Sequence, residues 1–257
     1  MIKFKPRKVD KRGNNTPIVS NMEIDEYAHA VLADYRPKLL RSPGKVSYQH
    51  FLESYMGKEI EFYDIYTKDP DRPILGMTAF EKGRIRVFDE DEETVKRVLV
   101  KENTVILNSL LLEPGKEGVA LFTGIHEGGH SLMHWDVYAG GEVCPVVCCR
   151  RENIENFNAA KKERTAADWR EHHADYYAAA FTMPNATFLP FINALLREQG
   201  FFKGAIKLGM DEDLDILAND ILPEIITETY GVSKRAARIK LRQTGFVLPQ
   251  RAMNRGA

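Results

Sequence analysis

The sequence lacks an apolar run long enough to cross a membrane. Its longest near candidate is GVALFTGI, residues 118–125, whereas a membrane-spanning helix needs ~20 apolar residues. The basic N-terminal stretch MIKFKPRKVDKR is followed by the polar residues GNNTP and not by the apolar core of a signal peptide. We therefore expect a cytoplasmic protein that makes no membrane contact, in which residues 1–20 form a disordered basic arm.

Cysteine is scarce, and its distribution argues against a disulfide framework. The 257 residues include 3 cysteines, which are Cys144, Cys148 and Cys149. An odd number of cysteines in a chain without a secretion signal is typical of reduced thiols. The alternative is a zinc site built on the Cys-x3-Cys-Cys spacing, but no matching Cys or His pair nearby completes four ligands.

An excess of charge of either sign is also missing. The 36 basic and 37 acidic residues give a formal net charge of -1, so the overall composition does not indicate a nucleic-acid-binding protein. Hydrophobic residues make up 44% of the chain, as in an ordinary folded protein. The sequence contains no internal repeat, and its length suits one large domain or two small ones.

The pattern of apolar residues changes from helical to strand-like after residue 58. A capping box formed by Ser20 and Glu23 starts a helix over residues 21–36, and a shorter helix covers 47–56. Period-two alternation then predicts a sheet of four or five strands from five candidate segments, the second and third of which are joined as a hairpin. These segments are EIEFYDIY (59–66), GMTAF (76–80), RIRVF (84–88), RVLV (97–100) and TVILN (104–108). We expect an α+β fold with helices packed on a small antiparallel or mixed sheet.

Helical patterns return in the last third of the chain. RTAADWREHHADYYAAAFTMP, residues 164–184, is rich in alanine until Pro184 stops it, and a further helix closes at Gly200. LPEIITETYGVSKRAARIKLRQTG, residues 222–245, predicts a helix, a turn at Gly231 and a second helix capped by Ser233.

The strongest functional signal is GIHEGGHSLMH, residues 124–134. Residues four apart share a helix face, so the imidazoles of His126 and His130 can converge on one metal ion. Glu127 projects about 100° away from His126, where it can reach a water on the metal without being a ligand. This spacing is typical of zinc-dependent hydrolysis, in which the carboxylate accepts a proton as the water attacks a peptide carbonyl.

A catalytic zinc also needs a third protein ligand and an open position. His134 lies about 12 Å from His126 along the helix axis, too far to share one ion, and we expect it to pack or hydrogen-bond near the helix end. A third histidine ten positions after the first is the alternative spacing, but it is missing here because position 136 is Asp. Glu171 is the better candidate, because Asp175 shares its helix face and can accept the free ring N–H of a zinc histidine.

The residues beside Glu171 have several candidate roles. His172 and His173 are weaker candidates as ligands, since His173 is two positions from Glu171 and faces away from it. The two histidines, together with Tyr176 and Tyr177, are candidates for contacts with the oxyanion or the substrate. The sequence does not choose among them.

Several blocks occur in the order found in the ImmA/IrrE metallo-endopeptidases, which the sequence resembles from about residue 21 to 247. TVILNSLLL leads through a loop to LFTGIHEGGHSLMH, similar to the family's strand, loop and FTxxHExGHxxxH helix. EHHADYYAAAFTMP is similar to its ExEAxxFAxxLLMP helix. YGVSKRAARIKLRQTGF is similar to its closing fGVSxxAxxxRLxxLG segment.

The resemblance implies a zincin-like (gluzincin) peptidase domain over residues 21–190 and a C-terminal helical subdomain over residues 191–257. It further implies a Zn2+-dependent endopeptidase, although Mn2+ and Fe2+ suit the same donors. Its substrate would be a helix-turn-helix transcriptional repressor encoded by a mobile element or a stress-response locus.

Carried over to this chain, the family's ligands and catalytic glutamate fall on four residues, namely His126, His130, Glu171 and Glu127. The chain departs from the family pattern at Gly128, which is usually apolar, and at His173, which is commonly Glu. The interval from His130 to Glu171 is also long for the family. These departures bear on helix rigidity and substrate preference more than on zinc binding.

The closing helix-turn-helix pattern leaves a different function open. From Lys234 to the end the chain contains seven basic residues and no acidic one, a density that could face phosphates. The alternative is therefore a DNA-binding regulator whose peptidase-like part holds a metal without cutting. Against it, Leu241 and the alanines suit a packed helix, so docking of a repressor's helices is the stronger expectation for this segment.

Overall fold

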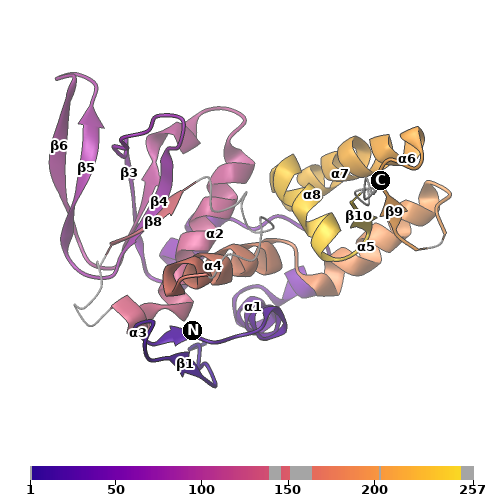
Figure 1. Cartoon of the computed structure of the whole chain (residues 1–257), viewed down its shortest axis with the longest axis horizontal. Helices are drawn as coiled ribbons and strands as arrows, with labels where there is room; N and C mark the ends of the chain where they lie inside the picture. Colours follow the sequence, from indigo (N-terminus) through magenta and orange to yellow (C-terminus); the bar gives the residue numbers. More distant parts are fainter. Residues whose placement is uncertain (1, 139–145, 151–163, 203, 250–257) are drawn as a thin grey trace, which may run out of the picture.

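A four-stranded mixed sheet covered by a long helix forms the half of the molecule that carries the candidate site (Figure 1). The computed structural model describes residues 2–138, 146–150, 164–202 and 204–249, and its fold is α+β. Strands β3 and β7 are parallel, and β4 is antiparallel to both of its neighbours. In their order across the sheet, the strands are β3 (Glu59–Tyr63), β7 (Thr104–Asn108), β4 (Ile74–Ala79) and β8 (Val146–Arg150).

Helices pack around this sheet and extend away from it. Helix α2 (Glu117–Met133) lies on β4 and β7, α4 (Ala166–Thr182) packs along α2, and α1 (Asn21–Tyr35) packs on α4. The predicted capping box of Ser20 and Glu23 at the start of α1 is confirmed. The other helices are η1 (Pro37–Leu40), η2 (His50–Tyr55), η3 (Ser109–Leu112), α3 (Trp135–Tyr138), α5 (Asn185–Glu198), α6 (Glu212–Ile216), η6 (Leu217–Ile221), α7 (Leu222–Tyr230) and α8 (Lys234–Gln243).

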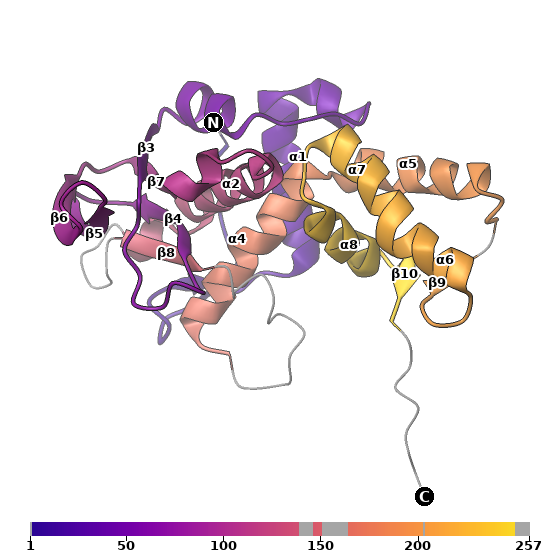
Figure 2. The same ribbon diagram turned by 90° about the horizontal axis from the view of Figure 1, so that it is seen from above.

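The predicted hairpin of residues 76–80 and 84–88 is wrong. Strand β5 (Gly83–Asp89) instead pairs along its whole length with β6 (Thr94–Val100), and this ribbon projects from the sheet at the end opposite to α5–α8 (Figures 1 and 2). Every residue of β4 is buried, as in a central strand, and it pairs with β7 and β8. In β5 buried and exposed residues alternate, which is typical of a strand with one covered face.

The glycines of α2 lie where neighbouring elements approach the helix most closely. A methyl group at Gly128 would lie 3.2 Å from atoms of Phe51 and Leu52 in η2. A methyl group at Gly129 would lie 3.0 Å from the ring of Tyr177 and 3.4 Å from the backbone of Ala174 in α4. Close packing on two sides of the helix therefore leaves little room for a side chain at either position.

The N-terminal residues predicted as a disordered arm have defined contacts from residue 2 onward. Strands β1 (Val9–Asp10) and β2 (Thr16–Pro17) form a small antiparallel hairpin. The Tyr27 hydroxyl donates to the carbonyl of Ile2 over 2.9 Å, and Arg170 of α4 donates to the Thr16 hydroxyl over 2.6 Å. Composition suggested disorder, but these tertiary contacts hold the segment against α1 and α4.

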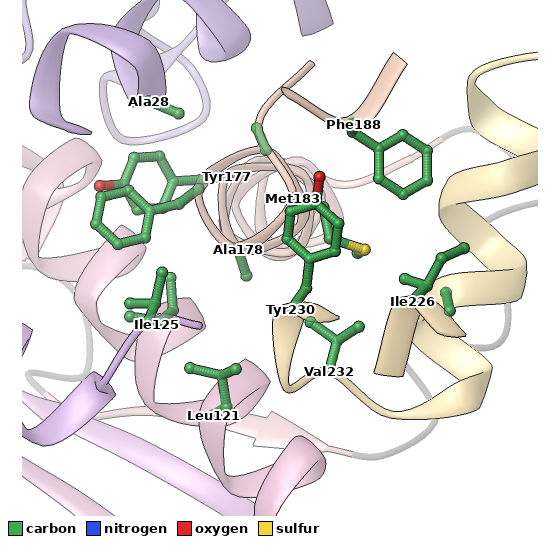
Figure 3. Close-up of a cluster of buried hydrophobic side chains, with 14 of the residues drawn as sticks. Ala28, Leu121, Ile125, Tyr177, Ala178, Met183, Phe188, Ile226, Tyr230 and Val232 are labelled. Atoms are coloured by element: carbon green, nitrogen blue, oxygen red, sulfur yellow. The ribbon is translucent and has the colours of Figure 1, made fainter. Parts of the chain in front are cut away.

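The C-terminal helices share one hydrophobic core with the rest of the chain. The predicted boundary at residue 190 falls inside α5, and two short parallel strands, β9 (Ile206–Lys207) and β10 (Val247–Leu248), lie beyond it. Figure 3 shows Tyr230 and Val232 from the α7–α8 region beside Leu121 of α2 and Ala178 of α4. The predicted turn and cap are present, because Gly231 is left-handed at φ 74° and the Ser233 side chain accepts from the Ala236 N–H.

A buried lysine in this core predicts a stabilising substitution. Lys240 of α8 is 3% exposed, and burial, opposed in part by Asp25, lowers its pKa to about 8. The cost of burying the charge is present below pH 8 and is relieved as pH rises toward 10.5, because the folded lysine loses its proton before the unfolded one. We expect Lys240→Met to raise the free energy of unfolding by about 1–3 kcal/mol at pH 7, measured by urea unfolding. The exposed Lys207→Met is the control, and equal stability of both variants would contradict the argument.

Within the described residues, no single helix is both long enough and apolar enough to cross a bilayer, although the bent pair α4 and α5 meets those criteria when taken together.

Candidate metal centre

Two helices bring three potential metal ligands together. His126 and His130 lie one turn apart on α2, with their Nε2 atoms 3.0 Å from each other. The Glu171 carboxylate of α4 lies 3.5 Å from His126 Nε2 and 3.4 Å from His130 Nε2. One ligand atom from each of the three residues lies within 4.8 Å of the other two. These residues, which the sequence predicted as ligands, could therefore hold a metal ion.

The position of Glu171 follows from the start of its helix and from the packing of α4. The Thr165 side chain accepts from the Asp168 N–H, and the Asp168 carboxylate accepts from the Thr165 N–H, so a capping box fixes the first turn of α4. Glu171 then comes nearly one turn later. Gly129 allows the two helices to approach closely enough for this carboxylate to reach the histidines.

The electrostatics of the centre suit a cation. Burial alone would raise the pKa of Glu171, but the neighbouring His130 and hydrogen bonds from both histidines outweigh it and lower the pKa below its ordinary value. The carboxylate is therefore ionised at neutral pH. Both histidines are fully buried, while the Glu171 side chain is 15% exposed, so the centre lies at the margin of the interior.

Asp175 supports the first histidine from behind. Its Oδ1 lies 2.8 Å from His126 Nδ1, the ring nitrogen turned away from Glu171. Asp175 follows Glu171 by four residues, so both carboxylates face α2. A carboxylate in this place fixes the ring orientation and the tautomer of a metal-binding histidine.

The contact between Asp175 and His126 predicts that replacing Asp175 weakens metal binding. We expect Asp175→Ala to weaken zinc binding about 10- to 100-fold, the usual effect of removing such a partner. Competition with a chromophoric chelator measures the change. Asp136→Ala, at an exposed position beyond the end of α2, should bind zinc as the unmodified protein does, and equal affinity of the two variants would contradict the assigned role.

Glu127 is held in the interior beside β4. Its side chain is completely buried, and the Thr78 hydroxyl donates to its Oε2 over 2.6 Å. Its Oε1 has no hydrogen-bond partner among the described residues. A methyl group at Gly76 would lie 2.8 Å from this oxygen, so glycine there leaves room for the carboxylate. Burial raises the pKa of Glu127 despite the opposing effect of the two histidines, as suits a proton acceptor.

His134 lies outside the three-residue cluster, and it makes a hydrogen-bonding contact as the sequence predicted. It is the C-cap residue of α2 and is fully buried, with its Nδ1 3.0 Å from His130 Nδ1. Burial, reinforced by His130 and His173, lowers the pKa of His134 well below its ordinary value. The ring is therefore neutral at physiological pH.

The other four candidates for substrate or oxyanion contacts lie at the cavity wall or in the interior. His172 Nε2 lies 2.8 Å from the side-chain oxygen of Asn21, and the Tyr176 hydroxyl donates to Asp25 over 2.8 Å. Both line the cavity described next. Tyr177 is fully buried in the hydrophobic core, so a substrate does not reach it in this structure. His173 is buried and contacts His134.

A cavity of about 220 Å³ lies beside the centre, between α2, α4 and α8. Asp175 and Thr123, one helical turn before Glu127, reach it from the metal side. Its walls are mostly apolar and include residues from α8 that the sequence did not connect with the site. The apolar part of the wall comprises Pro73, Leu75, Leu110, Val119, Phe122, Ala179, Ala236 and Ile239, and the charged residues Lys116 and Arg235 also line the cavity.

The chain was compared with family models, curated proteins and solved structures. None of the three comparisons gives a match. The candidate centre therefore rests on its own residues and their geometry.

Two residues beside Glu127 were missed by the sequence reasoning. Gly76 and Thr78 lie two apart on β4, so they share a face of the strand. No local sequence pattern indicates either residue. Thr78, for example, is 49 residues away from Glu127, the residue to which it donates. Cys148 and Cys149 lie on β8, in register with Met77 and Gly76. Cys144 falls outside the described residues.

Proposed function

We propose that the protein is a zinc-dependent endopeptidase with a gluzincin-like core, related to the ImmA/IrrE metallo-endopeptidases. The observation that carries the proposal is the convergence of His126, His130 and Glu171, with the buried carboxylate of Glu127 next to the first histidine. A site that only stores or senses a metal has no need of that additional carboxylate.

The donor set fits a catalytic metal. Two imidazole nitrogens and one carboxylate oxygen leave a coordination position open, as in hydrolytic zinc sites. Mn2+ and Fe2+ accept the same donors, so the protein's affinity alone does not select the native metal. When bound, zinc would supply Lewis-acid chemistry that activates water and polarises the peptide carbonyl.

The protein's own groups would handle the proton. Thr78 fixes one oxygen of Glu127, so the other oxygen keeps a defined direction and is available to accept a proton from water. The raised pKa of this buried carboxylate makes it a stronger base than an exposed glutamate. The same group can return the proton to the leaving amine, by microscopic reversibility.

The apolar cavity supports a protein substrate. It would take an apolar side chain near the scissile bond, and α8 would form part of its wall. As substrate we propose a helix-turn-helix transcriptional repressor, which rests on the resemblance of the sequence to the ImmA/IrrE proteins.

The contacts of α8 favour the peptidase over the alternative of a DNA-binding regulator. Arg238 donates to the carbonyl of Asn219 over 2.6 Å, and Lys234 forms an ion pair with Glu224. The turn before α8 packs so closely on α2 that a methyl group at Gly118 would lie 2.5 Å from the Ser233 nitrogen. Arg238 and Lys234 therefore interact with other residues of the chain. A DNA-recognition helix would instead present such basic side chains to phosphates.

A cleavage assay tests the proposal. The purified protein, loaded with zinc or treated with chelator, is mixed with the helix-turn-helix regulator encoded beside its gene and with a proteome-derived peptide library, and products are read by mass spectrometry. We expect internal cuts that require metal. Absence of cleavage in every loaded sample, together with a shift of DNA by the protein alone, would favour the regulator.

A further inference from the structure

A line of four buried histidines runs from the metal centre toward the start of α4. His126 contacts His130 through the Nε2 atoms, and His130 Nδ1 lies 3.0 Å from His134 Nδ1. His134 Nε2 in turn lies 3.3 Å from His173 Nδ1. His134 and His173 are 0% and 1% exposed. Neither belongs to the candidate ligand cluster.

The geometry fixes the proton positions along this line. A neutral imidazole carries its hydrogen on one nitrogen and a lone pair on the other. A histidine that binds a metal through Nε2 must carry its hydrogen on Nδ1. The Nδ1–H of His126 therefore donates to Asp175, and the Nδ1–H of His130 donates to His134.

The same rule continues beyond His130. His134 Nδ1 must accept, so its hydrogen lies on Nε2 and donates to His173 Nδ1, which must also accept. A doubly protonated His134 would direct an N–H against the N–H of His130, because imidazolium donates from both nitrogens. The arrangement thus requires neutral rings at both positions and one tautomer for each.

We propose that His134 and His173 are positioning residues that hold His130 in its metal-binding tautomer. They fix the ring orientation and tautomer of His130, as Asp175 does for His126. The inference rests on the proposed metal centre. The proposed arrangement makes His126 a more basic ligand than His130, because a carboxylate acceptor raises the basicity of its histidine more than a neutral imidazole does.

Zinc affinity measured on the full chain separates this role from simple packing. We expect His134→Phe, which fills the space without an acceptor, to weaken zinc binding about 10- to 100-fold. His134→Asn places an oxygen near the position of Nδ1 and should recover most of the loss. His173→Leu should weaken binding less than His134→Phe, because it acts one contact further from the ligand.

His172→Phe is the matched control. The His172 ring lies 6.1 Å from that of His173, but its Nε2 is hydrogen-bonded to Asn21 and it is not one of the four hydrogen-bonded histidines, so its replacement should leave zinc affinity unchanged. Unfolding of every variant in excess chelator shows whether a change comes from the metal site or from the fold. If His134→Phe does not fold, the test is the comparison of His134→Asn with His173→Leu, of which only the second should bind zinc more weakly.

Two-bond 1H–15N spectra of the zinc-loaded protein give an independent readout. The expected tautomers are Nδ1–H for His126 and His130 and Nε2–H for His134 and His173. Equal zinc affinity of His134→Phe and the unmodified protein would overturn the inference, as would an imidazolium or an Nδ1–H tautomer at His134. Failure of the unmodified protein to bind zinc would instead reject the proposed centre itself.

Discussion

Replacing Glu127 with glutamine is expected to slow peptide hydrolysis about 10²- to 10⁴-fold, the usual contribution of a general base. Glutamine has nearly the same shape and can still accept from the Thr78 hydroxyl through its amide oxygen. It cannot accept a proton from water at neutral pH. Zinc affinity should not change, because Glu127 lies outside the three-ligand cluster.

The comparison needs the rate constant at saturating substrate and the zinc content of the same preparations. Glu117→Gln, in the exposed first turn of the same helix, is the control for removing one carboxylate from α2. A Glu127→Gln protein that cuts as fast as the unmodified one would exclude Glu127 as the base. A large loss of zinc would show that the residue acts through the metal.

Removing the ligand carboxylate should have the largest effect on metal binding. We expect Glu171→Gln to lower zinc affinity by more than the roughly 10- to 100-fold caused by changing a supporting residue such as Asp175. The amide keeps the size of the side chain but loses the charge that the two histidines stabilise. Peptide hydrolysis should disappear with the metal.

Elemental analysis after gel filtration and competition with a chromophoric chelator measure this loss. Glu198→Gln, exposed at the end of α5, removes the same charge far from the site and should bind one zinc per chain. Stoichiometric zinc in the Glu171→Gln protein would require a different third ligand.

The parts of the site that the sequence predicted are those encoded by local spacing. His126 and His130, like Glu171 and Asp175, are four residues apart on their helices, so helical periodicity places each pair on one face. The predicted caps of α1 and α8 are equally local, since each is formed by residues three apart.

Features that depend on tertiary packing were missed or misread. The hairpin involving β4 was wrong because strand pairing is decided by partners distant in the sequence, here β7 and β8. The departure from the family pattern at Gly128 is accounted for only by η2, which places Phe51 and Leu52 against it. Thr78 gave no signal, since threonine is common in strands and only the packing of β4 on α2 gives it a carboxylate partner.

The glycine-rich helix α2 also bears on the order of folding. Two glycines in consecutive positions cost about 2 kcal/mol relative to alanine, so α2 gains much of its stability only when η2 and α4 pack against it. His126 and Asp175 are 49 residues apart in sequence, and the entropy of closing that loop opposes their meeting early. We therefore expect α2 to be only partly ordered until α4 docks, so that docking of α4 completes the helix and the centre in one step.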